Sequence, residues 1–486
     1  MQYGLPTYGW RIALPKIASI AGCRGLSGSD RLDSAGATHD QPLPTAGLWR
    51  DLGVLPRGRV HTSWDVVHNR EDGDRFIALT PYFAVYWITM TQQPAHICIL
   101  GGGFGGLYTA LALDRLPWPP LQHPRITLVD QRDRFTFAPL LYELLTGELQ
   151  TWEVAPPYAE LLSETRIQFR QTAVNQVDLA NQRVDLADGS SLDYDRLVLA
   201  LGGETPVDQV PGAQEHAIPF RTVHDAYRLD ERLRLLETSE VDKIRVAIVG
   251  GGTSGVELAC KLADRLGKRG RLRLVERGED LLKRSPEFNR EASRKALSDR
   301  GVWLDLETQV TQVTGDSLSL DYRGQIDTIP VDIVLWTVGT QVAEVVRSLP
   351  VPHNDQGQLT ITPTLQVVEH PHVFALGDLA ACEDAAGQRI PATAQAAFQQ
   401  ADYAAWNIWA DLSDRPLLPF RYQNLGEMMT LGIDNATLMG LGLTLDGQLA
   451  HIFRRLAYLY RMPTFDHQLK VGLNWIARPL RELLST

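Results

Sequence analysis

Two glycine-rich segments, each placed directly after a short apolar run, constrain the fold of this chain more than any other feature. The first is HICILGGGFGGL, from residue 96, and the second is RVAIVGGGTSGVEL, from residue 245. In a dinucleotide-binding unit with the pattern G-x-G-x-x-G, the first glycine permits the turn and the second lets a pyrophosphate approach the backbone. The third lets the helix pack on the strand. These positions are Gly101, Gly103 and Gly106 in the first segment and Gly250, Gly252 and Gly255 in the second.

The sequence that follows each glycine loop matches the rest of a dinucleotide-binding unit. A second apolar run ends in an acid, Asp130 in the first copy and Glu276 in the second, where a carboxylate can accept hydrogen bonds from a ribose. Further on, VDLADGSSLDYDRLVLALGG and LSLDYRGQIDTIPVDIVLWTVGT share alternating strands, a turn and a buried strand, and they contain Gly202 and Gly339. One copy could be an ordinary tight turn, but a repeat of the whole plan predicts an α/β fold with two Rossmann-like domains.

The segment HPHVFALGDLAA, after the second repeat, predicts that the second domain is inserted in the first. Its strand is followed by Asp378, where the ribitol hydroxyls of a flavin would need an acceptor. A Gly-Asp pair is also common in ordinary turns. On the functional interpretation, the first domain resumes here after the second is complete.

The bulk composition excludes one class of function and bears on the N-terminal segment. A net charge of −11 argues against a general nucleic-acid binder, which would carry a basic balance. The four cysteines are at least 75 residues apart, which suits a reducing compartment. Residues 1–89 lack a sustained period, yet they are too acidic for a transit peptide. We expect this extension to be unstructured or misannotated upstream sequence, with the native protein starting at Met90.

Two further segments carry a resemblance to a known family. They are FTFAPLLYELLTGEL, over 135–149, and IPATAQAAFQQADYAAWNI, over 390–408. Together with the glycine loops, they resemble the type II NAD(P)H:quinone oxidoreductases, which are flavoproteins with two dinucleotide-binding domains. The tail, with RYQNLGEMMTLGIDNATL and LAYLYRMPTFDHQLKVGLNW, is most similar to the cyanobacterial and plastid branch that reduces demethylphylloquinone. Glu143 departs from the family pattern, since many relatives carry Gln there. The lack of a cysteine pair argues against disulfide reductases and sulfide:quinone oxidoreductases.

The resemblance implies a non-proton-pumping NAD(P)H:quinone oxidoreductase with tightly bound FAD. Hydride would pass from NADH or NADPH to the flavin, and two electrons would pass on to a membrane quinone, demethylphylloquinone or plastoquinone. Glu276 favours the free 2′-hydroxyl of NADH, whereas the adjacent Arg277 could meet the 2′-phosphate of NADPH. The implied domains are an FAD-binding domain over 90–210 and 331–402, an NAD(P)H-binding domain over 211–330, and a C-terminal quinone and membrane-association region over 403–486.

The resemblance also assigns roles to individual side chains. Pro139 lies in the family's flavin-side segment, and Glu257 is placed near the nicotinamide, although an acid there also suits the helix dipole. Gln395 and Gln399 are assigned to the quinone, because their i, i+4 spacing puts both amides on one helix face. Polar residues on a helix face are also often only solvated. Thr393 is a candidate N-cap of this helix, and no metal site is expected.

The C-terminal region predicts a pair of helices that lie in a membrane interface. Between 449 and 481 there are six basic residues and one acid, and apolar residues recur at helical spacing, with Pro479 expected to kink or end the helix. No apolar run reaches the roughly 20 residues that span a bilayer. We expect a peripheral membrane protein that binds anionic lipid on the cytoplasmic or stromal face of the plasma or thylakoid membrane. The alternative is that the stripe packs on the protein's own body or on a second subunit in a homodimer. The basic residues are Arg454, Arg455, Arg461, Lys470, Arg478 and Arg481; the apolar ones are Leu469, Leu473, Ile476, Leu480 and Leu483; the aromatic ones expected at the lipid headgroups are Phe453, Tyr458, Tyr460, Phe465 and Trp475.

Two functions from other classes stay open on the sequence alone. One is an FAD-dependent NAD(P)H reductase of a protein acceptor such as ferredoxin. The other is a nucleotide-sensing, FAD-bound interaction protein without turnover. An acidic or basic docking patch would favour the first of these, and the apolar C-terminal region does not.

Overall fold

A largely parallel sheet forms the first half of the fold in the computed structural model, which describes residues 94–119 and 122–485. The expectation for residues 1–89 lies outside this described part. Strand β1 is buried along its whole length, as expected for a strand in a sheet that is covered on both faces. The strand order is β19 (Gln366–Val367), β20 (His370–Ala375), β7 (Arg196–Leu199), β1 (His96–Leu100), β2 (Arg125–Asp130) and β3 (Gln168–Gln171), with β19 alone antiparallel to its neighbour.

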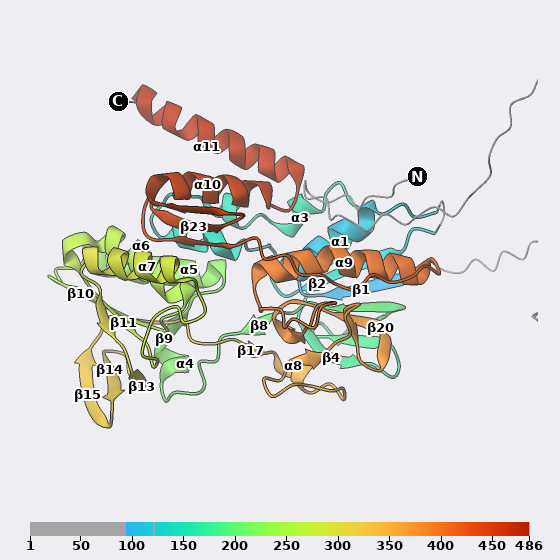
Figure 1. The fold of residues 1–486 in the computed structure, drawn as a ribbon, viewed down its shortest axis with the longest axis horizontal. Helices are drawn as coiled ribbons and strands as arrows, with labels where there is room; N and C mark the ends of the chain where they lie inside the picture. The colour runs from blue at the N-terminus through green and yellow to red at the C-terminus, as the bar shows by residue number, and fades with distance from the viewer. Residues whose placement is uncertain (1–93, 120–121, 486) are drawn as a thin grey trace, which may run out of the picture. The chain divides into compact units, whose positions relative to one another are not determined.

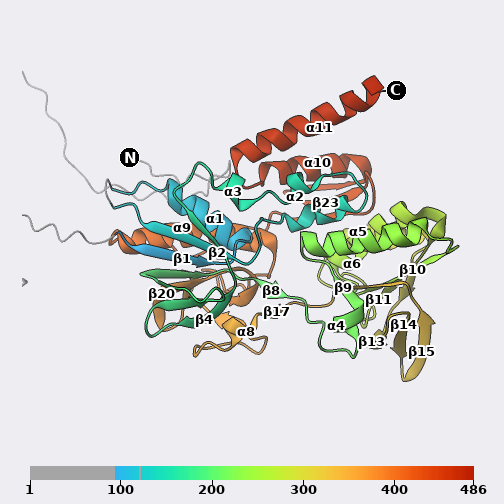
Figure 2. The same ribbon diagram turned by 180° about the vertical axis from the view of Figure 1, so that it is seen from behind.

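Two helices pack side by side on this first sheet (Figures 1 and 2). Helix α1 (Phe104–Arg115) begins at the first glycine loop, and α9 (Ala394–Leu412) comes from far along the chain. Thr393 is the N-cap of α9, as predicted, because its side chain accepts a hydrogen bond from the Ala396 backbone N at 3.2 Å. Since α9 is continuous to Leu412, the predicted domain boundary at 402 falls inside a helix.

A second, fully parallel sheet lies between the two parts of the first one in the sequence. Its strand order is β12 (Trp303–Asp305), β11 (Gly270–Val275), β10 (Ile244–Val249), β16 (Ile333–Trp336) and β9 (Ala217–Pro219). Helices α5 (Val223–Thr238), α6 (Thr253–Leu266) and α7 (Glu287–Asp299) lie beside this sheet (Figure 1). Because β16 pairs with both β10 and β9, the predicted boundary at 331 is too early, and the second sheet extends to Trp336.

The two halves repeat one plan and are joined at one place. Each carries a three-stranded antiparallel sheet, β4 (Val174–Asp178), β5 (Arg183–Leu186) and β6 (Ser191–Asp193) in the first and β13 (Thr308–Val313), β14 (Ser317–Tyr322) and β15 (Gln325–Pro330) in the second. The chain leaves the first half through β8 (Gly203–Glu204) and returns through β17 (Gln341–Val342), and these two strands pair antiparallel. The predicted fold class, with one Rossmann-like domain inserted in another, is confirmed.

The C-terminal region adds an antiparallel sheet and two helices. Strands β22 (Glu427–Thr430), β23 (Ala436–Gly440) and β24 (Leu443–Asp446) precede α10 (Gly447–Tyr460) and α11 (Phe465–Ser485), and α10 lies beside β23 (Figures 1 and 2). The helix pair was predicted from the sequence and the sheet was not. Helix α11 continues past Pro479, so the expected end of the helix there is wrong. Within the described residues, no helix is both long and apolar enough to cross a membrane.

Shorter elements connect these parts. They are η1 (Ala138–Leu144), α2 (Thr151–Val154), α3 (Tyr158–Leu161), α4 (Ala213–His216), η2 (Gly267–Arg269), α8 (Glu344–Arg347), β18 (Leu359–Thr360), η3 (Gly377–Leu379) and β21 (Ala380–Ala381).

Candidate active site

The first glycine loop leaves open space at its second glycine. Gly101 has a φ of +98°, and a Cβ there would lie 2.3 Å from the Ala200 carbonyl oxygen. A Cβ on Gly106 would lie 1.8 Å from the Gly101 oxygen, so these two positions require glycine for the fold itself. A Cβ on Gly103 would meet nothing within 4 Å, and Gly103 is the N-cap of α1. The open position beside the helix N-terminus fits a pyrophosphate.

The second glycine loop has the same geometry. Gly250 has a φ of +114°, and a Cβ on Gly255 would lie 1.9 Å from the Gly250 oxygen, whereas one on Gly252 would meet nothing within 4 Å. Among the glycines of the described chain, Gly103 and Gly252 are the two that combine this free space with a φ outside the positive region. Neither packing nor backbone conformation requires glycine at these two helix N-caps, and the open space beside each of them fits a phosphate group.

Polar groups surround each loop at the carboxyl edge of its sheet. Asp130, at the end of β2, accepts hydrogen bonds from the backbone N of Gly102 at 2.7 Å and of Arg132 at 2.9 Å. Asp378 follows β20, and its carboxylate lies 3.3 Å from the Arg221 guanidinium. Gly202 follows β7 with a φ of +70°. Since β1, β2, β7 and β20 are parallel, these predicted residues meet at one edge, an arrangement that fits FAD.

The acid of the second half is held in the same manner. Glu276 follows β11, and its two carboxylate oxygens accept hydrogen bonds from the backbone N of Gly251 and Gly278, each at 2.7 Å. Gly339, after β16, has a φ of +71°. The predicted NAD(P)H residues therefore also lie at one edge of their sheet.

The flavin-side segment η1 contains a fully buried ion pair with the C-terminal region. The Glu143 carboxylate lies 2.5 Å from Arg454 Nη1, and both side chains have no exposed surface. Arg454 Nη2 donates to the Pro139 carbonyl oxygen at 2.6 Å, and its guanidinium lies 4.9 Å from the centre of the Tyr458 ring. Burial alone would raise the pKa of Glu143, but the charges of Arg454 and Lys261 outweigh it and lower that pKa. Glu143, which departs from the family pattern, therefore forms an ion pair with Arg454.

Glu257 lies where the two halves and the C-terminal region meet. Its carboxylate accepts a hydrogen bond from the Thr430 backbone N at 2.8 Å and lies 4.0 Å from Arg454 Nη2. Burial raises the pKa of Glu257 to about 7. Nearby, the Tyr142 hydroxyl of η1 donates to Ser254 Oγ of α6 at 3.0 Å and thereby links the two halves.

Gln395 and Gln399 lie on one face of α9, as predicted, but their amides already have protein partners. Gln395 Oε1 accepts from the Tyr422 hydroxyl at 2.8 Å and from Leu425 N at 3.1 Å, and its Nε2 donates to the Gly426 oxygen at 3.1 Å. Gln399 exchanges two hydrogen bonds with the Gln423 backbone, at 2.8 and 3.0 Å. Both amides therefore attach segment 422–426 to α9, while contact with a quinone stays a prediction.

Gln395→Ala should lower the stability of the protein. We expect the free energy of unfolding to fall by about 1–3 kcal/mol, because Leu425 N and the Gly426 oxygen lose their partner. Urea unfolding of the yellow protein measures the change, with Gln399→Ala as the matched variant one helical turn later. An unchanged transition midpoint together with slowed quinone reduction would contradict this structural role and favour the direct contact.

The basic residues of the C-terminal helices correct the predicted lipid contact. Arg454 is fully buried, Arg455 lies 3.6 Å from Glu148 and stacks over the Trp475 ring, and Arg461 stacks over the Phe398 ring. Three of the six basic residues are thus directed at the protein, since each of their guanidinium groups gains a protein partner. An excess of basic residues in a sequence does not show which way they point.

Two predicted lipid-facing aromatics also belong to the body of the protein: the Tyr458 ring packs against Arg454 and Phe137, and Trp475 is hydrogen-bonded to α2. Trp475 Nε1 and Asn474 Nδ2 donate to the same oxygen of the buried Glu153, at 2.8 and 3.2 Å. These bonds fix one side of α11 against α2. The opposite side is apolar and exposed, with Leu469 at 50%, Leu473 at 58% and Ile476 at 67%.

The three described cysteines are buried, and their raised thiol pKa values make them unreactive in thiol–disulfide exchange. Burial raises the pKa of the Cys98 and Cys260 thiols to about 12 and that of Cys382 to about 11. All three are free thiols. Since the thiolate is the reactive form, none of them is suited to the exchange chemistry of a disulfide reductase.

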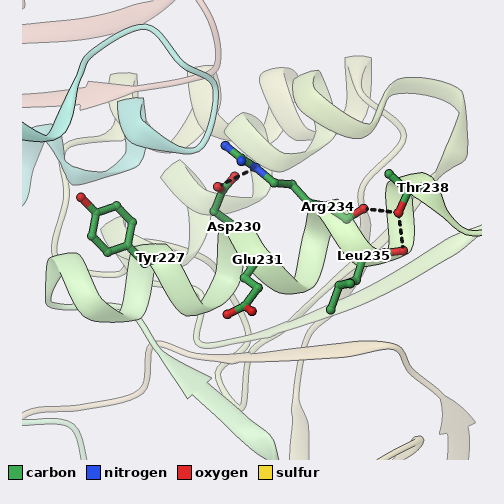
Figure 3. A pocket seen from close by; sticks show the side chains of 6 residues that line it. All are labelled: Tyr227, Asp230, Glu231, Arg234, Leu235 and Thr238. Atoms are coloured by element: carbon green, nitrogen blue, oxygen red, sulfur yellow. Dashed lines mark hydrogen bonds and ion pairs between the residues drawn. The ribbon is translucent and has the colours of Figure 1, made fainter.

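A surface pocket on α5 is separate from both glycine loops. Its lining residues all come from this one helix, and Asp230 pairs with Arg234 along it (Figure 3). They are Tyr227, Asp230, Glu231, Arg234, Leu235 and Thr238, and none is a predicted cofactor residue.

Comparisons with known proteins agree with this geometry. The family model for pyridine nucleotide-disulphide oxidoreductases matches residues 95–401. The chain is 57% identical to demethylphylloquinone reductase NdbB of Synechocystis sp., over 82% of this chain and 99% of the relative. It is 44% identical to the alternative NAD(P)H-ubiquinone oxidoreductase C1 of Arabidopsis thaliana, over 79% of this chain and 80% of the relative. Its fold is similar to that of NDH2 from Plasmodium falciparum in complex with NADH, with a TM-score of 0.70 at 17% identity, over 79% of this chain and 98% of that one. The chain therefore belongs to the pyridine nucleotide-disulphide oxidoreductase family and, within it, to the type II NAD(P)H:quinone oxidoreductases.

Proposed function

We propose that the protein is an FAD-dependent NAD(P)H:quinone oxidoreductase that reduces a membrane quinone. The observation that carries this proposal is the open space at Gly103 and Gly252, where a Cβ would meet nothing within 4 Å and a phosphate group would fit in each half of the fold. When bound, FAD supplies the chemistry that accepts hydride and releases electrons to the acceptor. The absence of a described reactive thiol favours a direct acceptor at the flavin over a disulfide relay.

The residues of the two glycine loops would bind and orient the two nucleotides. The N-termini of α1 and α6 would direct backbone N–H groups at the pyrophosphates, and Asp130 and Glu276 would accept hydrogen bonds from the ribose hydroxyls. Asp378 would serve the ribitol of the flavin. The N-terminus of α9, capped by Thr393, would stabilise negative charge on a reduced flavin.

The nature of the reductant and of the quinone is the finer part of the proposal. We propose that NADH is preferred, because Glu276 is a carboxylate and would repel a 2′-phosphate. Exposed Arg277 is the residue that would offset this repulsion for NADPH. Demethylphylloquinone is the proposed acceptor, with plastoquinone as the alternative, since the 57% identical relative is named for the former.

A flavin spectrum followed by steady-state kinetics tests the function. The purified protein should be yellow, its flavin should be bleached by NADH under anaerobic conditions, and a short-chain quinone should restore the colour with turnover. Comparing kcat/KM for NADH and NADPH tests the preference. Reduction of ferredoxin but not of quinones would instead support the protein-acceptor reductase. Flavin reduction without turnover on either acceptor would support the nucleotide sensor.

The exposed apolar side of the C-terminal helices is the proposed contact with a lipid surface, at the cytoplasmic or stromal face of the membrane. Leu449, Phe453 and Leu456 of α10 are 63%, 49% and 54% exposed, and Leu469, Leu473 and Ile476 extend this apolar character along α11. Because Arg454, Arg455 and Arg461 are turned toward the protein, insertion of apolar side chains should dominate over attraction to anionic lipid.

Substituting Leu469, Leu473 and Ile476 together with Ser should release the yellow protein from lipid vesicles. Each exposed side chain contributes about 1 kcal/mol of apolar transfer, so binding should weaken by roughly a hundredfold. Cosedimentation with neutral and with anionic vesicles measures the effect, and salt should change it little.

A triple substitution at exposed apolar residues of the second half is the matched control. Leu235, Trp303 and Ile326 are 59%, 64% and 70% exposed, and their replacement with Ser should leave vesicle binding intact. If the α11 variant still sediments with vesicles, the lipid contact lies elsewhere. If it instead changes from dimer to monomer in sedimentation velocity, the apolar side is a contact between two copies.

A further inference from the structure

One buried cation lies between two buried acids from the two halves of the fold. Arg454 of α10 is 2.5 Å from Glu143 of η1 and 4.0 Å from Glu257 of α6. Glu143 and Arg454 are fully buried, and Glu257 is 5% exposed. Two buried carboxylates therefore share a single guanidinium, and its position determines which of them is compensated.

The hydrogen bonds direct this guanidinium to the η1 side. Arg454 Nη1 donates to Glu143 and Nη2 donates to the Pro139 carbonyl oxygen at 2.6 Å, both within η1. The Tyr458 ring stacks against the same group. Glu257 receives its hydrogen bond from the Thr430 backbone N instead. Glu143 is thus hydrogen-bonded to the guanidinium, whereas Glu257 lies 4.0 Å from it without a hydrogen bond to it.

The surroundings of Glu257 are otherwise neutral. Among the described residues, the titratable or charged groups that interact with it are Tyr142 and Glu143 from η1, Arg454 and Tyr458 from α10, and the neutral Cys260 thiol of its own helix, with β22 contributing a backbone N–H. Burial raises the pKa of Tyr458 to about 12 and that of Tyr142 well above its ordinary value, so both stay neutral at neutral pH. Glu143 and Arg454 are therefore the two charged groups that act on the pKa of Glu257.

We propose that Glu143 is a positioning residue that holds Arg454 on the η1 side and so leaves Glu257 free to exchange a proton at neutral pH during NAD(P)H oxidation. This inference rests on the proposed function. Reduction of a quinone by NAD(P)H transfers one hydride and takes up one proton from solvent, so a group that changes protonation has a defined use. Glu257 lies in the first turns of α6, directly after the glycine loop assigned to NAD(P)H.

Glu143→Gln tests the proposal in the intact yellow protein. The amide oxygen still accepts from Arg454, but the negative charge that neutralised the guanidinium is gone, so Arg454 acts on Glu257 unopposed. The protonation midpoint of Glu257 should fall by about one pH unit or more. Two measurements report it: the pH dependence of anaerobic flavin reduction by NADH, and the infrared carbonyl band of the protonated carboxyl. Exposed Glu164→Gln is the matched control and should leave both unchanged.

Two more variants identify the titrating group and protect the test against misfolding. Glu257→Gln should remove the infrared band and the pH dependence. Glu143→Gln combined with Arg454→Met removes both charges of the pair. Proteins often tolerate the replacement of both members of a buried ion pair. This double variant should raise the protonation midpoint of Glu257 above that of the unaltered protein. An unchanged midpoint in Glu143→Gln, an unchanged or lower one in the double variant, or a band that survives Glu257→Gln overturns the inference. Quinone turnover in the unaltered protein tests the proposed function independently of these results.

Discussion

Gly103→Val is expected to give a folded but colourless protein. In the structure a Cβ at this position meets nothing within 4 Å, and the backbone is extended, a conformation that valine adopts readily. The fold therefore has room for a Cβ at this position. The branched side chain would instead occupy the place of the FAD pyrophosphate at the N-terminus of α1. The ratio of flavin to protein absorbance measures the loss, and circular dichroism verifies the fold.

Gly106→Val separates a steric defect in the chain from a defect in the ligand site. A Cβ there would collide with the Gly101 oxygen at 1.8 Å, so this variant should lose its fold and not only its colour. Full yellow colour in Gly103→Val would show that the pyrophosphate does not use the first loop.

Gly252→Val is expected to give a yellow protein whose flavin NADH reduces very slowly. This position repeats the geometry of Gly103 in the second loop, with an extended N-cap and no atom within 4 Å of a Cβ. A clash that costs about 3 kcal/mol corresponds to roughly a hundredfold weaker nucleotide binding. Anaerobic stopped-flow reduction over a range of NADH concentrations measures this, and dithionite should still bleach the flavin.

The two valine variants serve as controls for one another. Gly103→Val should remove colour, whereas Gly252→Val should keep colour and remove reduction by NADH. If Gly252→Val were colourless and Gly103→Val yellow, the assignment of FAD to the first loop would be reversed. If both kept colour and rate, neither loop would carry a nucleotide.

The nucleotide-binding architecture was predictable because its determinants are local. Positive φ at Gly101 and Gly250, and a carboxylate one strand later, are properties of short segments, and the repeat doubled the signal. The boundaries at 331 and 402 were misplaced because strand pairing and helix length depend on neighbours that are distant in sequence. The direction of Arg454 could not be predicted, because three basic residues of one helical region look alike until a buried acid selects among them. Glu143 was the available signal, since a buried acid needs a cation, but it did not identify which one.

The insertion of the second domain between β8 and β17 has a consequence for the order in which the two domains fold during synthesis. All strands of the second sheet lie between residues 217 and 336, whereas the first sheet needs β1 from residue 96 and β20 from residue 370 onward. As the chain emerges from the ribosome, the inserted domain has its full set of strands before the surrounding domain does. We therefore expect capture of FAD, for which Asp130 and Asp378 are the proposed hydrogen-bond acceptors, to be a late step that follows folding of the inserted domain.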